Sequence, residues 1–164
     1  MPTRSYDKDE LTVLWDSSRC IHTGICLRTL PEVFDVRSRP WVRVDGAGAD
    51  EIAAAVRKCP TGALRYVRDG ESEPGPNETT MIPVRNGPLI VRGRLRVIDP
   101  STGAAIAEET RLTLCRCGKS QNEPFCDNSH RRTGFEESGS QAMPQRAEAE
   151  SPAEICPPQD FVLE

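Results

Sequence analysis

The chain has few aromatic side chains, only two histidines among its 164 residues and no long apolar run. No stretch approaches the ~20 consecutive apolar residues that a membrane-spanning helix needs, so we expect no membrane partner. The scarcity of aromatics and a net charge of −4 argue against nucleic-acid binding. The sequence also contains no Ser-His-Asp set, nucleotide-binding glycine loop or paired carboxylates. We therefore expect a protein that is not an enzyme.

The first ten residues, MPTRSYDKDE, are polar and lack the apolar segment of a secretory signal. Nothing in them directs the chain to an oxidising compartment, where disulfides form and persist. We therefore expect a cytoplasmic protein whose seven cysteines are available for other chemistry.

Four potential metal ligands lie close together in the second half of the sequence. Cys115 and Cys117 form a C-x-C pair, Cys126 follows after eight residues, and His130 comes four residues later. If a helical turn begins at Cys126, residues i and i+4 lie on one side of it. Three thiolates and one imidazole can then converge on one centre, and such ligands select zinc, copper(I) or an iron-sulphur cluster.

This run resembles the CDGSH iron-sulphur domain of the mitoNEET family, whose pattern is C-x-C-x2-(S/T)-x3-P-x-C-D-G-(S/A/T)-H. The matching residues are Cys115, Cys117, Ser120, Pro124, Cys126, Asp127, Ser129 and His130. Asn128 replaces the usual glycine, and asparagine tolerates the positive φ that a glycine there suggests. The resemblance covers residues 81–135 and implies one 2Fe-2S cluster, held by the three cysteines and His130.

A zinc site with three cysteines and one histidine uses the same ligand set. Zinc sites usually separate their first two cysteines by two to four residues, whereas one residue separates Cys115 from Cys117. The spacing therefore favours the iron-sulphur cluster, and a structural zinc-binding adaptor remains the alternative.

A second group of cysteines lies in the first half of the sequence. Cys20 and Cys26 are six residues apart, and a remote Cys59 is followed by proline. In the C-x2-C-x2-C and C-P pattern of bacterial ferredoxins, these are the first, third and remote ligands, and Thr23 replaces the second cysteine. The missing thiolate predicts a 3Fe-4S cluster, or a 4Fe-4S cluster whose last iron binds another group such as His22 or solvent.

Residues 11–67 resemble the divergent 4Fe-4S mono-cluster ferredoxins. The supporting residues are Cys20, His22, Gly24, Cys26, residues 30–34, residues 40–42 and residues 59–64. The resemblance implies a low-potential, ferredoxin-like carrier. The alternative for these cysteines is three buried free thiols.

The distribution of charge and of chain-breaking residues predicts two small domains. The ferredoxin-like cluster domain occupies residues 1–67, residues 68–80 form a linker, and the CDGSH-type 2Fe-2S domain occupies residues 81–135. Residues 136–164 form an acidic tail that we expect to be disordered over most of its length. Cys156 lies in this tail, and we interpret it as a free thiol, with supply of the missing ligand as the alternative.

The predicted fold class is α+β. Strands are expected at residues 11–15, 41–44 and 64–67, with helices at 22–30 and at 50–58, the latter capped by Asp50. This β-α-β-α-β order indicates a small ferredoxin-like α+β domain. Strands at residues 89–98, 104–107 and 111–114 indicate a small antiparallel β domain after it.

Thiolate-bound iron-sulphur clusters mainly pass single electrons, and histidine ligation raises the reduction potential. The sequence therefore predicts one-electron transfer between redox partner proteins, a reductase and an acceptor, by two clusters of different potential. The alternative is cluster transfer, or redox and pH sensing, through a labile 2Fe-2S cluster. The basic excess of residues 79–135 predicts a docking surface for an acidic redox partner, and binding of the chain's own acidic tail is the equal alternative. The family resemblance implies a homodimer as one possible oligomeric state.

Overall fold

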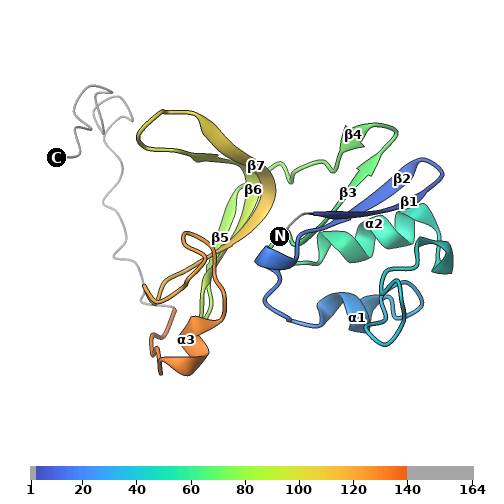
Figure 1. The fold of residues 1–164 in the computed structure, drawn as a ribbon. Coiled ribbons are helices and arrows are strands. Elements are labelled where there is room, and N and C mark those ends of the chain that lie inside the picture. Colours follow the sequence, from blue (N-terminus) through green and yellow to red (C-terminus); the bar gives the residue numbers. More distant parts are fainter. Residues whose placement is uncertain (1–2, 140–164) are drawn as a thin grey trace.

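Two antiparallel sheets organise the chain, and the computed structural model describes residues 3–139 of it (Figure 1). The first sheet has the strand order β1-β2-β3-β4 and the second the order β5-β6-β7. The elements are β1 (Arg4–Lys8), β2 (Leu11–Trp15), η1 (Ser17–Arg19), α1 (Ile25–Thr29), η2 (Val44–Gly46), α2 (Ala49–Arg57), β3 (Leu64–Arg68), β4 (Glu71–Ser72), β5 (Thr80–Pro83), β6 (Leu89–Ile98), β7 (Ala105–Leu114) and α3 (Ser129–Arg132).

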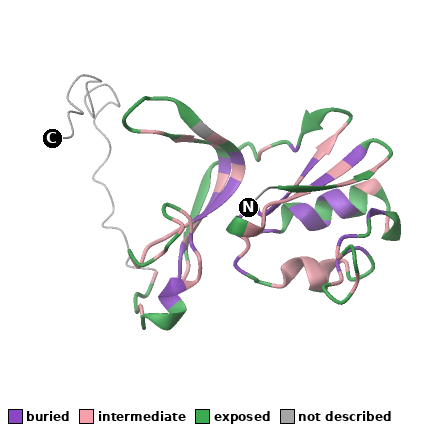
Figure 2. Ribbon diagram, viewed as in Figure 1, coloured by how far each residue is buried: buried purple, intermediate pink, exposed green. Residues whose placement is uncertain are grey.

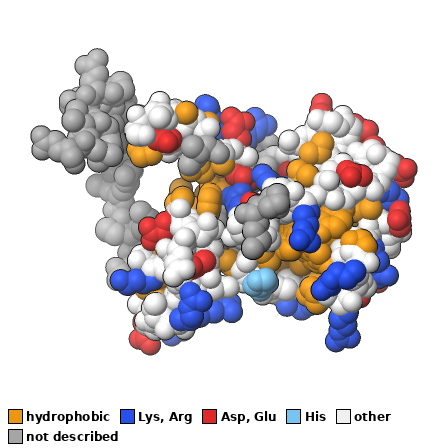
Figure 3. Space-filling model, viewed as in Figure 1, with side chains coloured by type: hydrophobic (Ala, Val, Ile, Leu, Met, Phe, Trp, Pro, Cys, Tyr) orange, Lys and Arg blue, Asp and Glu red, His pale blue; other side chains and the backbone are white. Residues whose placement is uncertain are grey.

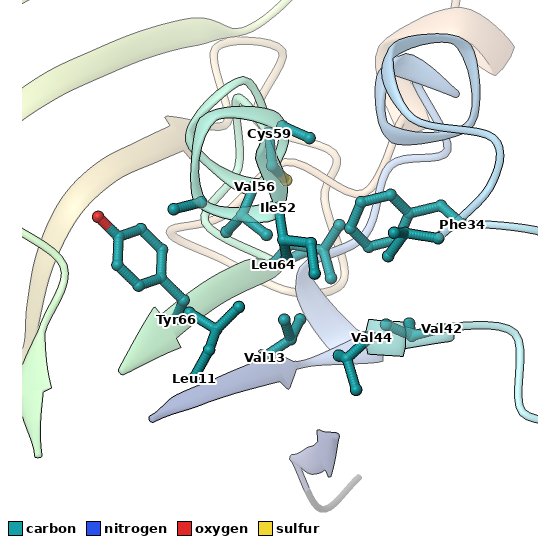
Figure 4. Close-up of a cluster of buried hydrophobic side chains, with 14 residues drawn as sticks. Leu11, Val13, Phe34, Val42, Val44, Ile52, Val56, Cys59, Leu64 and Tyr66 are labelled. Atoms are coloured by element: carbon teal, nitrogen blue, oxygen red, sulfur yellow. The ribbon is translucent and has the colours of Figure 1, made fainter. Parts of the chain in front are cut away.

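The first half has a hydrophobic core between its sheet and helix α2. Leu11 and Val13 on β2 and Leu64 and Tyr66 on β3 alternate with less buried neighbours, as expected of strands with one covered face. Figure 4 shows α2 lying across this face. The buried cluster contains Leu11, Val13, Val33, Phe34, Val42, Val44, Ile52, Ala53, Ala55, Val56, Cys59, Ala63, Leu64 and Tyr66.

The second half is a three-stranded sheet followed by a long loop and α3. Strands β6 and β7 pair over most of their length, with irregularities between Arg92 and Leu95 and between Val97 and Ile98. Among the described residues of this half, the buried apolar side chains are Pro88, Val91, Leu112 and Cys126. None of them belongs to the buried cluster of the first half.

The sequence predicts the coarse architecture, and several of its details need correction. The segment 41–44 is no strand, because Val42 makes one isolated bridge to Phe34 and η2 begins at Val44. Helix α2 begins at Ala49 after Gly48, whose N–H donates to Glu51 Oε2 at 3.0 Å, so Asp50 is not its N-cap. Strand β1 was not predicted.

Two further differences concern element boundaries. Helix α1 covers Ile25–Thr29, a shorter segment than the expected 22–30, because the chain first turns at Gly24 with a φ of +67°. The expected strands 104–107 and 111–114 are one continuous strand, β7. These findings support a small fold of two antiparallel sheets with few helices.

Arg111 on β7 inserts into the first half and ties the two halves together. Its guanidinium donates to the carbonyl oxygens of Val56, Cys59 and Leu64 at 3.1, 2.7 and 2.6 Å. It also pairs with Glu73 at 2.6 Å, and both side chains are almost completely buried. The buried part of β7 beside the first half is visible in Figure 2.

A second buried ion pair and a glycine complete this interface. Glu109 on β7 pairs with Arg19 and, at 3.2 Å, with Arg65. Gly62 has a φ of +70°, and a Cβ there would lie 2.8 Å from the carbonyl oxygen of Arg111. A side chain at position 62 would therefore push β7 away from the loop that carries Cys59.

None of the helices described between residues 3 and 139 is long and apolar enough to cross a bilayer. Residues 140–164, with most of the predicted acidic tail and Cys156, lie outside the described residues.

Candidate metal centres

The four predicted ligands of the second half lie in two close pairs. The Sγ atoms of Cys115 and Cys117 are 3.7 Å apart. The Sγ atom of Cys126 lies 3.5 Å from Nδ1 of His130, although the two residues are four apart in sequence. His130 and Cys126 are buried, at 8% and 4% exposure, so their donor atoms are withdrawn from bulk water.

Backbone pairing fixes the two ends of the loop that carries these cysteines. The Cys115 N–H donates to the Pro124 carbonyl at 2.9 Å, and the Cys126 N–H donates to the Thr113 carbonyl at 2.9 Å. Inside the loop, the Ser120 hydroxyl donates to the Phe125 carbonyl at 2.7 Å. The loop therefore continues the edge of β7 and returns Cys126 to the C-x-C pair.

Asn128 makes the turn that brings His130 back to Cys126. Its φ is +71°, which confirms the positive φ expected at this position. The sequence predicts a helix starting at Cys126, whereas α3 starts at Ser129 and the turn precedes it. Asp127 accepts hydrogen bonds from the backbone N–H groups of Gln121 and Ser129, which holds its pKa far below the usual carboxyl range.

The surroundings of these donors differ in their effect on protonation. Burial would raise the pKa of Cys115, but backbone N–H groups of Ser120, Lys119 and Gly118 outweigh it and lower that pKa. Burial raises the pKa of Cys126, and it lowers the pKa of His130, with the nearby Arg131 adding to the second effect. A neutral imidazole is the form that binds metal, so burial favours His130 as a ligand.

The three predicted ligands of the first half line one small cavity of about 30 Å³. Cys20 lies before α1, Cys26 is in α1, and Cys59 follows α2 at the edge of the hydrophobic core (Figure 4). Burial raises the pKa values of Cys20 and Cys26, and the charge of Cys59 raises both further. The thiols are therefore close enough to interact electrostatically.

Among the described residues, Cys20, Cys26 and Cys59 are the only cysteines that line this cavity. Thr23, His22 and Thr61 also line it. Nδ1 of His22 lies 3.8 Å from Sγ of Cys20, and the Thr61 hydroxyl lies 3.5 Å from Sγ of Cys59. Among the described residues, the side-chain groups that line the cavity and could bind a metal are therefore three thiols, two hydroxyls and one imidazole.

Two indole N–H groups test whether the cavity fits a sulphur-rich group. Trp15 and Trp41 line the cavity, and their rings pack edge to face at 4.9 Å. Both Nε1 atoms are buried and have no hydrogen-bond partner among the described residues. Buried donors normally find an acceptor, and the thiolate or sulphide sulphurs of a cluster would supply one. The residues present therefore fit an iron-sulphur cluster.

The same region opens to the surface as a hollow of about 900 Å³. Cys20, Cys26 and both tryptophans line it, with Arg4 and Arg39 on its walls. Figure 3 shows a broad hydrophobic patch with basic side chains around it on this half of the molecule. The first centre is thus near a surface that a partner can reach.

Sequence reasoning missed the side chains that position the ligand loops. Arg111 holds the Cys59 carbonyl, and Arg19, beside Cys20, lies with its guanidinium carbon 4.5 Å from the centroid of the Phe125 ring. The only signal was an excess of basic residues in the second half, which we interpreted as a docking surface. One of those basic residues, Arg111, faces inwards with its acidic partner Glu73.

Within residues 3–139, no set of three or more cysteine, histidine or carboxylate side chains is compact enough for a single metal ion. The second group forms two pairs with donor separations of 3.5 and 3.7 Å. Such pairs suit a cluster, in which different metal atoms take different ligands.

Comparisons with known proteins match each half of the chain to a family. The model of the family described as "Divergent 4Fe-4S mono-cluster" matches residues 6–69, and that of "Iron-binding zinc finger CDGSH type" matches residues 86–131. The uncharacterized protein YjdI of Escherichia coli (strain K12) is 29% identical over 63 residues, which cover 38% of this chain and 83% of YjdI. YjdI of Escherichia coli O157:H7 matches to the same extent. The chain therefore joins a domain of the divergent 4Fe-4S mono-cluster family to a domain of the CDGSH iron-binding family.

Proposed function

We propose that this protein transfers single electrons between redox partner proteins through two iron-sulphur clusters. Cys115, Cys117, Cys126 and His130 would hold a 2Fe-2S cluster. Cys20, Cys26 and Cys59 would hold a 3Fe-4S or 4Fe-4S cluster. When bound, such clusters accept and release one electron at a time.

The observation that carries the proposal is the position of the three thiols of the first half. Residues separated by up to 39 positions meet at one cavity, beside two buried indole N–H groups that lack protein partners. Three inert buried cysteines would not require unpaired donors beside them, because leaving a buried donor unsatisfied costs roughly 1–3 kcal/mol.

The protein's own residues set the properties of each centre. Around the second centre, the backbone amides of residues 118–120 favour the thiolate of Cys115, and burial keeps His130 neutral. Around the first, the two tryptophans offer buried N–H donors. Hydrogen bonds to sulphur and histidine ligation both raise reduction potential, so the residues act on the two centres by different means.

Metal analysis and spectroscopy of anaerobically purified protein test this function. We expect iron and acid-labile sulphide for two clusters, and two reversible one-electron reductions followed by EPR. Stoichiometric zinc without sulphide would instead support a structural adaptor. Rapid delivery of intact cluster to an apo-ferredoxin, with no electron exchange with a reductase, would support the cluster-transfer alternative.

Thr23 determines the type of the first cluster in this proposal. A hydroxyl at the position of the second ferredoxin cysteine favours a 3Fe-4S cluster, or a 4Fe-4S cluster that readily loses one iron. Thr23→Cys is expected to yield a stable 4Fe-4S cluster, recognised by loss of the EPR signal of the oxidised 3Fe-4S form. An air-stable 4Fe-4S cluster in the unaltered protein would assign the fourth position to another ligand, with His22 the nearest candidate.

A further inference from the structure

The ligand loops of the two centres touch each other at several points. The Asn128 side-chain amide donates to the Ile21 carbonyl at 2.7 Å, and the Thr113 hydroxyl donates to the Pro60 carbonyl at 2.9 Å. The Asn122 side chain also donates to the Ser18 carbonyl at 2.9 Å. These contacts span 53 to 107 residues of sequence, so the fold brings the loops together.

Two of these hydrogen bonds begin and end beside predicted cluster ligands. Ile21 directly follows Cys20, and Asn128 lies two residues from both Cys126 and His130. Pro60 directly follows Cys59 and, on the other side, Thr113 is two residues before Cys115. Each bridge therefore joins the two ligand sets through one hydrogen bond and at most two residues on either side.

Several of the side chains around these bridges are buried. Thr113 has 2% exposure, and the buried Arg111–Glu73 and Arg19–Glu109 ion pairs flank it in the same interface. Arg19, itself beside Cys20, stacks on Phe125, which is beside Cys126. Ion pairs buried between two domains are stable only when their partners are well aligned, so these pairs indicate that the two halves are in close contact.

We propose that the two centres form one intramolecular electron path, with Asn128 and Thr113 as the residues that connect their ligand loops. This inference rests on the proposed function. One electron enters from a reduced donor protein at the first centre, which is reduced. It then passes to the second centre, so that the first is reoxidised as the second is reduced, and an oxidised acceptor protein removes it. The higher potential expected from histidine ligation sets this direction.

Asn128 replaces the glycine that the CDGSH pattern has at this turn. A glycine has no side-chain amide, so it could not donate the hydrogen bond to the Ile21 carbonyl. Glycine adopts the same positive φ, so Asn128→Gly keeps the turn and removes the bridge. The variant also removes Oδ1 of Asn128, which is buried and has no partner among the described residues. Its effect on stability is therefore expected to be small.

The test is flash reduction of the full, cluster-loaded chain with a photoreduced flavin, supplied at less than one electron per molecule. In the unaltered protein, we expect the absorbance changes to show reoxidation of the first centre together with reduction of the second. This phase should be first-order, with a rate that is independent of protein concentration. Asn128→Gly should slow this phase several-fold. Asn86→Gly is the matched control, because Asn86 also has a positive φ and its Oδ1 accepts one hydrogen bond, from Glu137 N–H, that does not join the two ligand sets.

EPR of the fully reduced protein tests whether Asn128→Gly removes only the bridge or also changes the distance between the two centres. Magnetic coupling between the centres reports their separation, and it should be the same in Asn128→Gly and in the unaltered protein. If that coupling is lost, the two halves have separated in Asn128→Gly. The transfer rate is then measured in Thr113→Val, a change that preserves the shape of this buried side chain, and a slower rate in that variant supports the inference. A transfer rate that rises with protein concentration, or that neither variant lowers, overturns the inference. Absence of the clusters themselves would instead overturn the proposed function.

Discussion

The two halves of the molecule hold their candidate centres by different means. In the first half, a helix packs on a sheet over a cluster of 14 buried residues, and Cys59 belongs to that cluster. In the second half, few apolar side chains are buried, and the buried residues include Glu109, Arg111, Ser129 and His130. The first half can fold by hydrophobic burial, whereas the second depends on its ligands and on its contacts with the first.

Because the second half buries few apolar side chains, its interface with the first half is expected to stabilise it, in addition to the proposed role in electron transfer. Domains of roughly 60 residues are marginally stable without additional support. Under the proposed function, a bound cluster would support the second half, because its binding free energy contributes to folding. It also lays β7 against the loop of Cys59, so Arg111 completes the hydrogen bonding at the end of α2. Loss of either support should affect the second half more than the first.

The largest expected effect comes from removing one thiolate in each half. Cys126→Ser should abolish the 2Fe-2S spectrum and leave the signal of the first centre intact. It should also unfold the second half locally, because that half lacks a core of its own among the described residues. Limited proteolysis should then cleave within residues 81–135, while Cys59→Ser, which removes the first cluster, should leave a protease-resistant first half.

The result depends on the difference in protease sensitivity between the two halves. Equal protease sensitivity of both halves in both variants would mean that the chain unfolds as one unit and that the hydrophobic core gives the first half no independence. Retention of both cluster signals in Cys126→Ser would remove this cysteine from the ligand set.

A smaller but still large effect is expected from Arg111→Met. The change leaves the buried carboxylate of Glu73 without its ionic partner and removes the guanidinium donor from the carbonyl oxygens of Val56, Cys59 and Leu64. Breaking a buried ion pair in this way typically costs about 3–5 kcal/mol. The free energy of unfolding of the loaded protein, measured by denaturant titration, should fall by this order.

Arg96→Met is the matched control, because Arg96 pairs with Glu108 at 3.3 Å with both side chains well exposed. Exposed pairs contribute roughly 0–1 kcal/mol, so this variant should be nearly as stable as the unaltered protein. Equal stability of the two variants would show that the Arg111 contacts do not hold the halves together.

The sequence predicted the two families better than the relation between the halves. Candidate ligands such as Cys115, Cys117 and Cys126 could be proposed because a bound metal group constrains the spacing of its ligands. The long strand at 89–98 and the helix near 50–58 followed from apolar periodicity, and the structure has β6 and α2 there. The positive φ of Asn128 followed from the residue it replaces.

The remaining features depend on contacts distant in sequence. Strand β1 is polar, and it pairs with β2 through backbone groups that leave no periodic signal. Arg111 gives no sign in the sequence that it will be buried, because an arginine is normally exposed unless it is paired. Its partner, Glu73, lies in the segment 68–80 that we predicted as a linker. Only the fold shows that this residue is buried against β7.

The smallest expected effect concerns His130 and pH, and it distinguishes the mixed ligand set of the second half from the thiols of the first. Burial lowers the pKa of His130 below its ordinary value of 6.5, so the unfolded chain binds a proton there at higher pH than the folded chain does. The stabilising contribution of neutral His130 is therefore complete above pH 6.5 and is lost as the pH falls through the lowered folded-state pKa. Metal and proton compete for the imidazole, so acidification should release the 2Fe-2S cluster first.

His130→Cys should shift this release to lower pH and lower the reduction potential of the second centre, both followed by visible absorbance. His22→Asn, an exposed position with a φ of +53° that asparagine tolerates, should leave the acid release of the second cluster unchanged. If His130→Cys releases its cluster at the same pH as the unaltered protein, the imidazole is not the ligand that acid displaces.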